Sequence, residues 1–238
     1  MICFLTGRTD IPDTGELNPA NGFIEELRRR FPAHCRALNV CSDPDGWERT
    51  DHFAALTRQS FENEGFRFES FTVLDGRNAA RAAELVRGSD VIILAGGHVP
   101  TQNRFFHSIG LRELIKGFEG LVIGISAGSM NSADTVYAQP EHEGEAADPA
   151  YRRFLTGLGL TKKMLLPHYQ DMKDEVLDGL RLYEDITLPD SRGRAFYAIP
   201  DGSWLLIERG REELRDEAYL IKDGAVSRIS SEGGRVLL

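Results

Sequence analysis

Cysteine is scarce in this chain of 238 residues, which contains three cysteines. Cys3, Cys35 and Cys41 lack the spacing of metal ligands, and three thiols cannot all pair within one chain. Residues 1–7 hold too short an apolar run for a signal peptide and lack its basic flank. Because reduced thiols are normal in the cytoplasm, we expect a cytoplasmic protein whose cysteines serve packing.

Long apolar runs and blocks of positive charge are also missing. No run approaches the length of about 20 apolar residues that a membrane-spanning helix needs. The 37 acidic residues outnumber the 28 basic ones and give a formal net charge of -9 at pH 7. A surface with excess negative charge repels the phosphate groups of nucleic acids and of anionic membranes. We therefore expect no membrane partner, no nucleic-acid partner and a small-molecule substrate, bound by a monomer or homodimer.

Linkers, repeats and cofactor motifs are absent as well. No Pro/Ser/Gly-rich stretch divides the chain, which is long enough to bury a sizeable core, so we expect one domain, residues 1–238. The Gly96-Gly97-His98 segment lacks the lysine of a phosphate-binding loop, and the histidines and acids do not show the spacing of common zinc motifs. We expect no cofactor and no metal.

The sequence does contain a clear alternation of strand-like and helix-like segments. Strands are predicted at 2–6, 37–41, 66–74 and 91–94, with helices at 22–31, 47–64 and 79–86 between them. Alternation of this kind is typical of an α/β fold with a largely parallel central sheet flanked by helices. A further helix is predicted at 175–183. Short strands at 196–199, 204–208 and 218–221, with a hairpin signal at 222–225, indicate a C-terminal antiparallel extension at the sheet edge.

The most informative segment is Gly124-Ile125-Ser126-Ala127-Gly128, which follows the apolar run 121–123 and precedes a helix-compatible stretch. In a nucleophile elbow the glycines allow a sharp strand-to-helix turn that exposes the serine hydroxyl above the sheet. The next backbone N–H then lies beside the hydroxyl. The alternative interpretation is an ordinary glycine-rich connection between a strand and a helix.

A serine nucleophile needs a base, and His168 is the best-placed histidine. It ends the apolar run 164–167 and is followed by polar residues, as expected where a strand emerges at a sheet edge. The remaining histidines fit packing or solvated positions better, although His142 lies in an acidic loop that could approach the site. They are His34, His52, His98, His107 and His142.

Four motifs in order give the chain a resemblance to the S51 serine peptidases, the group of peptidase E and cyanophycinase. They are Leu-Ala-Gly-Gly-His at 94–98, Gly-x-Ser-Ala-Gly-Ser at 124–129, Pro-His-Tyr at 167–169 and Ile-Pro-Asp-Gly-Ser-Trp at 199–204. The resemblance implies a fold like that of the class I glutamine amidotransferases, with Ser126 as nucleophile and His168 as general base. It further implies an oxyanion hole made by the N–H groups of Gly97 and Ala127.

The resemblance also implies a third catalytic residue in the loop after the nucleophile helix. Ungapped register with the family places Glu141 there, where a carboxylate could orient the imidazole, with Glu143 and Glu145 as rivals. Gly96 and His98 are the expected substrate-binding residues, and His98 stands where peptidase E has asparagine. The segment 201–204 is interpreted as a turn.

Together these features predict a serine peptidase that cleaves amide bonds of small peptides through an acyl-enzyme. The resemblance to peptidase E suggests that the substrates are amino-terminal aspartyl dipeptides. Because His98 stands in place of the asparagine of peptidase E, the specificity stays open. The alternatives are a cyanophycinase-like hydrolase of β-Asp-Arg peptides, an esterase and a catalytically silent binding protein with the same fold.

Overall fold

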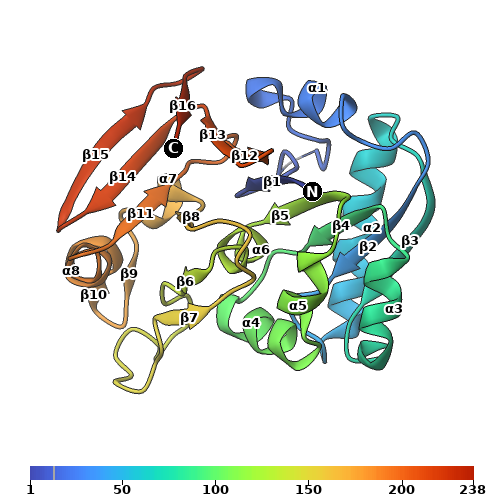
Figure 1. The fold of residues 1–238 in the computed structure, drawn as a ribbon. Coiled ribbons are helices and arrows are strands. Elements are labelled where there is room, and N and C mark those ends of the chain that lie inside the picture. Colours follow the sequence, from blue (N-terminus) through green and yellow to red (C-terminus); the bar gives the residue numbers. More distant parts are fainter. Residues whose placement is uncertain (13) are drawn as a thin grey trace.

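A sheet of eight strands forms the centre of the computed structural model, which describes residues 1–12 and 14–238 (Figure 1). Its order is β16-β13-β12-β1-β5-β4-β2-β3. The strands β1, β5, β4, β2 and β3 are parallel to one another, and β12, β13 and β16 continue the sheet in antiparallel fashion. The bounds are β1 Ile2–Thr6, β2 Cys35–Val40, β3 Phe68–Leu74, β4 Val91–Leu94, β5 Leu121–Ile125, β12 Trp204–Glu208, β13 Arg211–Arg215 and β16 Arg235–Leu237.

All residues of β4 are apolar, and those of β1 and β5 are apolar except for Thr6 and Gly124, because helices cover both faces of the sheet. In β4, Ile92 and Leu94 join one apolar cluster while Val91 and Ile93 join another, as the alternation of side chains along a strand requires. The first cluster includes side chains from α3 (Ala82–Arg87), α4 (Val99–Ser108) and α5 (Leu111–Lys116), and the second includes side chains from α1 (Phe23–Arg28) and α2 (Trp47–Asn63). The predicted α/β class with a largely parallel sheet is confirmed.

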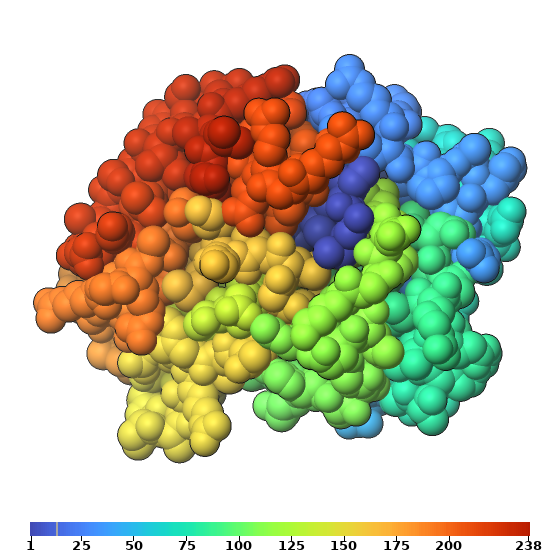
Figure 2. Space-filling view, viewed as in Figure 1, coloured from blue at the N-terminus to red at the C-terminus, as the bar shows by residue number. Residues whose placement is uncertain are grey.

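The remaining helices and strands in the described part of the first two thirds of the chain are two short 3₁₀ helices, one short helix and a pair of short strands. The 3₁₀ helices η1 (Ala20–Gly22) and η2 (Ala79–Arg81) precede α1 and α3, and α6 (Ala127–Asn131) follows β5. The antiparallel pair β6 (Thr135–Tyr137) and β7 (Phe154–Thr156) encloses a long loop, which projects at the lower left of Figures 1 and 2. Within the described ranges, no helix is both long and apolar enough to cross a membrane.

The predicted C-terminal antiparallel extension is present, but the C-terminal strands divide between it and a second sheet. Three of them, β12, β13 and β16, extend the main sheet. A second sheet has the order β15-β14-β11-β8, with bounds β8 Met164–Leu166, β11 Ala195–Ala198, β14 Ala218–Lys222 and β15 Ala225–Ser230. The predicted hairpin at 222–225 is confirmed, since Asp223 and Gly224 turn with φ of 52° and 83° between β14 and β15.

The helix predicted at 175–183 is wrong. The chain forms a small hairpin there, β9 (Val176–Leu177) and β10 (Leu180–Arg181), turning at Asp178-Gly179 with φ of 54° and 79°. An Asp-Gly pair favours this turn because both residues tolerate positive φ. A π-helical segment η3 (Leu182–Thr187) and α8 (Leu188–Asp190) follow. The Asp178 carboxylate accepts N–H groups from the loop between β6 and β7, at Gly144, Ala146 and Ala147.

Candidate active site

Ser126 occupies the sharp turn between β5 and α6. Its φ of 48° and ψ of -111° lie in a region that residues with a side chain seldom adopt. The flanking glycines are required by close packing: a Cβ at Gly124 would lie 2.8 Å from Leu5 Cδ2, and one at Gly128 would lie 2.2 Å from the Leu94 carbonyl oxygen. The elbow geometry that the sequence predicted is therefore present.

The imidazole of His168 lies against this serine. His168 follows β8 and Pro167 and precedes α7 (Tyr169–Met172), with φ of 60°. Its Nε2 is 3.0 Å from Ser126 Oγ, although the two residues come from different sheets. The structure thus brings together the serine and the histidine that the sequence singled out.

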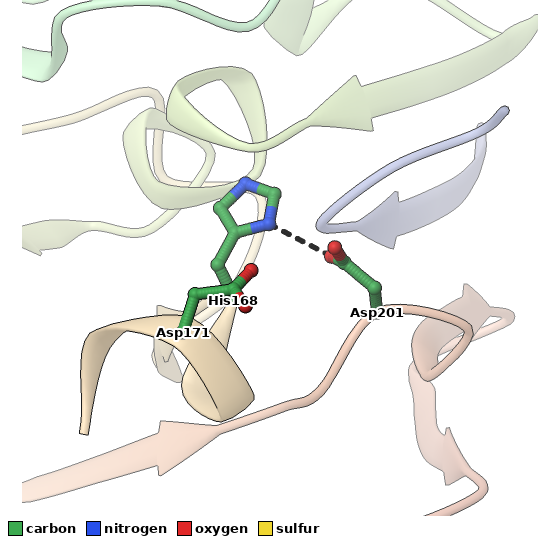
Figure 3. A group of neighbouring side chains, drawn as sticks. All are labelled: His168, Asp171 and Asp201. Atoms are coloured by element: carbon green, nitrogen blue, oxygen red, sulfur yellow. Dashed lines mark hydrogen bonds and ion pairs between the residues drawn. The ribbon is translucent and has the colours of Figure 1, made fainter. Parts of the chain in front are cut away.

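The carboxylate at the other ring nitrogen belongs to Asp201. His168 Nδ1 lies 2.7 Å from Asp201 Oδ1. A dashed line marks this contact in Figure 3. The contact follows from the parallel pairing of β8 with β11, in which Leu166 is opposite Ala198. Hydrogen bonds from Ile199 N–H to the Leu166 carbonyl continue this pairing past the strand ends, so His168 and Asp201 emerge side by side.

Two further residues hold the Asp201 carboxylate in place. The Gln170 side-chain amide donates to Asp201 Oδ2 at 3.0 Å and its carbonyl oxygen accepts the Asp201 backbone N–H at 3.0 Å. Directly after β1, a Cβ at Gly7 would lie 2.5 Å from Asp201 Oδ1, so the lack of a side chain there makes room for the carboxylate. The sequence predicted only a turn at Asp201, and no sequence pattern pointed to Gln170 or Gly7.

The structure corrects the expectation for Glu141. Both ring nitrogens of His168 are engaged, by Ser126 and Asp201, and Glu141 lies instead in the loop between β6 and β7. There the backbone N–H of Glu141 donates to Glu145 Oε2. The rivals do not serve either: Glu143 is exposed, and Glu145 contacts another histidine.

That other histidine is His98, and its position differs from the predicted substrate contact. Its Nε2 lies 2.8 Å from Glu145 Oε1 and its Nδ1 lies 2.8 Å from Thr101 Oγ1. The His98 ring also packs against His142 at 4.5 Å between centroids. With both ring nitrogens occupied, His98 links the start of α4 to the acidic loop and has no free donor for a substrate.

The predicted oxyanion donors have geometry suited to that role, which stays a prediction. Gly97 has φ of 144°, and a Cβ there would lie 2.2 Å from Ser42 Oγ, so only glycine fits. Ala127 is the first residue of α6. Neither N–H has an acceptor among residues 1–12 and 14–238. Gly96 lies beside the nucleophile, because a Cβ there would be 3.4 Å from Ser126 Cβ.

His168, Asp171 and Asp201 also place three ligand atoms within 4.8 Å of one another, the group in the described chain that could hold a metal ion (Figure 3). A cation bound there would have to replace a hydrogen bond that His168 makes to Ser126 or Asp201. Asp171 is exposed and accepts a hydrogen bond from the Gln170 amide. The arrangement fits a hydrogen-bonded Ser–His–Asp chain better than a metal centre.

Comparison with known proteins decides the family. A sequence profile of peptidase family S51 matches residues 3–215. The chain belongs to peptidase family S51. This family membership makes it a serine peptidase-type enzyme.

Two solved structures share the fold of this chain. A peptidase from an acI-B1 Actinobacterium superimposes with a TM-score of 0.70 at 15% identity, covering 100% of this chain and 96% of that one. A putative peptidase E protein from Listeria monocytogenes EGD-e gives a TM-score of 0.55 at 16% identity, covering 96% of this chain and 98% of that one. No match was found among curated proteins.

Burial and the nearby Glu145 carboxylate raise the pKa of Glu141 to about 8. Because this value lies above that of an unfolded glutamate, the folded chain holds a proton there that the unfolded chain releases. The resulting stability is complete below pH 4.5 and is lost as the pH rises through about 8. Glu141→Gln removes the titration, so we expect its unfolding free energy to exceed that of the natural chain at pH 9 by on the order of a few kcal/mol.

Urea unfolding of both proteins at pH 5 and pH 9 measures this difference. Glu143→Gln, an exposed position in the same loop, is the matched control and should leave the pH dependence unchanged. Equal pH dependence of Glu141→Gln and the natural chain would contradict the assignment of a protonated Glu141.

Proposed function

We propose that this S51 peptidase hydrolyses peptide bonds through an acyl-enzyme formed on Ser126. The observation that carries the proposal is the continuous chain from Ser126 Oγ to His168 Nε2 at 3.0 Å and from His168 Nδ1 to Asp201 Oδ1 at 2.7 Å. A hydroxyl, an imidazole and a carboxylate in this order form a nucleophile, its base and the group that orients the base.

The acylation step follows from these contacts. His168 Nε2 takes the hydroxyl proton as Ser126 Oγ bonds to the substrate carbonyl carbon. The N–H groups of Gly97 and Ala127 hold the resulting oxyanion, and Asp201 accepts the Nδ1–H hydrogen bond that fixes the ring tautomer. His168 then gives its proton to the amine nitrogen as the carbon–nitrogen bond breaks, which leaves an ester on Ser126.

Deacylation uses the same groups with water in place of the serine hydroxyl. His168 Nε2 takes a proton from water as the water oxygen bonds to the acyl carbon. The carbon–oxygen bond to Ser126 then breaks, and His168 returns the proton to Ser126 Oγ. The products are a carboxylic acid and free enzyme, so no further reactant is needed.

For the substrate, we propose small peptides with an aspartyl first residue, and the cations that support this choice are Arg8 and Arg49. Both line the cleft that also contains Ser126 and His168, whereas His98 does not. Arg8 Nε is 3.9 Å from Asp10, and Arg49 forms no ion pair with a residue in the described ranges. A guanidinium pairs well with a carboxylate.

A fluorophosphonate probe tests the proposed nucleophile. The folded protein should become covalently labelled, and mass spectrometry of its peptides should place the label on Ser126. Heat-denatured protein is the control and should remain unlabelled, since only the assembled site activates the hydroxyl. Labelling of another serine, or none in the folded protein, would overturn the proposal and favour a silent binding protein.

A further inference from the structure

The active-site cleft is much longer than the catalytic groups need. It has a volume of about 660 Å³ and continues from Ser126 and His168 along α2, whose residues line it from Arg49 to Asn63. The 17 residues of α2 span about 25 Å at 1.5 Å per residue. An extended dipeptide covers about 7 Å at 3.3 Å per residue.

Ser126 and the oxyanion segment Gly96-Gly97 lie toward the N-terminal end of α2. The loop between β2 and α2 reaches the oxyanion segment, because Ser42 Oγ would lie 2.2 Å from a Cβ on Gly97. Gly96 in turn lies beside Ser126. Since α2 returns from the carboxyl edge of the parallel sheet, its far end leads away from the catalytic groups. The cleft therefore offers a path for a chain that starts at Ser126.

One helical face forms this wall, and its chemistry suits a peptide. Cleft-lining positions of α2 recur at intervals of three and four residues, as Arg49, Phe53, Leu56 and Ser60 illustrate. Phe53 and Leu56 are 56% and 52% exposed and line the cleft, so they present apolar surface to anything bound there. Thr50, Thr57 and Asn63 on the same wall supply hydrogen-bonding groups for a backbone.

We propose that the substrates are extended peptides longer than two residues, with Phe53 and Leu56 forming an apolar subsite several residues from the scissile bond. This inference rests on the proposed function of Ser126, and it deepens that function from dipeptides to oligopeptides. Side-chain hydrogen-bonding groups along α2 would align the backbone of the substrate, and the subsite would favour an apolar side chain at the position that reaches it. Up to about seven residues fit in 25 Å at 3.3 Å each.

A length series tests the inference. Peptides that begin with Asp-Leu and contain two, four or six residues, the longer ones ending in leucine, are compared by kcat/KM. We expect the hexapeptide to exceed the dipeptide at least tenfold. Leu56→Ser should reduce this ratio to below threefold while kcat/KM for the dipeptide changes less than twofold, because the dipeptide does not reach the subsite. Phe53 is left unchanged in this variant because the Arg49 guanidinium lies over its ring, 5.9 Å from the ring centroid. If the natural protein cleaves the dipeptide and the hexapeptide with equal kcat/KM, the inference is overturned.

Trp47→Ser is the matched control, because Trp47 is an exposed apolar residue of the same helix that does not line the cleft. It should preserve the length preference, and a loss as large as that of Leu56→Ser would overturn the subsite. Fluorophosphonate labelling separates the two proposals: labelled Ser126 without a length preference refutes only the long substrate, whereas unlabelled protein refutes both.

Discussion

Replacing Ser126 with alanine should lower kcat for peptide hydrolysis by on the order of a millionfold, the scale seen when a serine protease loses its nucleophile. Alanine keeps the Cβ and the backbone N–H that donates to the Thr6 carbonyl at 2.9 Å, so the elbow is retained. We therefore expect an unfolding free energy within about 0.5 kcal/mol of the natural value. Turnover of a fluorogenic peptide and urea unfolding measure the two quantities.

Ser129→Ala is the control for loss of a hydroxyl, because Ser129 lies in α6, the helix that Ser126 directly precedes. Ser129 Oγ donates a buried hydrogen bond to the Thr6 carbonyl at 2.7 Å, so this change should cost stability of about 1 kcal/mol and leave the nucleophile intact. A Ser126→Ala protein that retains activity within tenfold of the natural chain, after purification from contaminating hydrolases, would contradict the mechanism.

Asp201→Asn should lower kcat by about ten-thousandfold, because an amide can hold His168 in the wrong tautomer while preserving the shape of the site. Glu141→Gln should stay within tenfold of the natural rate, since Glu141 lies in the loop between β6 and β7. Steady-state kinetics of the two variants on one peptide decide which carboxylate orients the imidazole. The opposite ranking would return that role to the acidic loop.

Asp171→Asn completes this comparison because Asp171 lies in the same group of possible metal ligands, whereas the His168 ring forms its hydrogen bonds with Ser126 and Asp201. A Ser–His–Asp mechanism predicts activity near the natural rate for this variant, with and without a chelator. Loss of activity comparable with Asp201→Asn, together with inactivation by the chelator, would instead support a metal centre.

The sequence predicted the parts of the fold that depend on local patterns. Apolar runs separated by helix-like segments predicted the parallel sheet. The glycines around Ser126 predicted the elbow, because an elbow is formed by a few consecutive residues. His168 could be selected because it follows a short apolar run. Asp201 also follows such a run, at 196–199, but its place beside His168 depends on β8 and β11 pairing in parallel across an intervening hairpin and helical segments.

Ungapped register with the family therefore predicted Glu141 as the third catalytic residue. Glu141 is nearer to Ser126 in sequence than Asp201 is, but it contacts a different part of the molecule. The helix predicted at 175–183 failed for a more local reason. Its polar composition suits a helix, but Asp178 and Gly179 favour a tight turn with positive φ, and the turn determined the structure. His98 was misjudged because the partner that occupies its ring, Glu145, lies far along the chain.

The catalytic residues come from two separately hydrogen-bonded sheets. Ser126 ends a strand of the main sheet, whereas His168 and Asp201 follow neighbouring strands of the second. A shift of about 1 Å between the two sheets would stretch the serine–histidine contact beyond hydrogen-bonding range and leave the histidine–aspartate pair intact. Hydrolysis should consequently fail at a lower urea concentration than the one that melts the secondary structure, and activity would serve as a sensitive reporter of how the two sheets are docked.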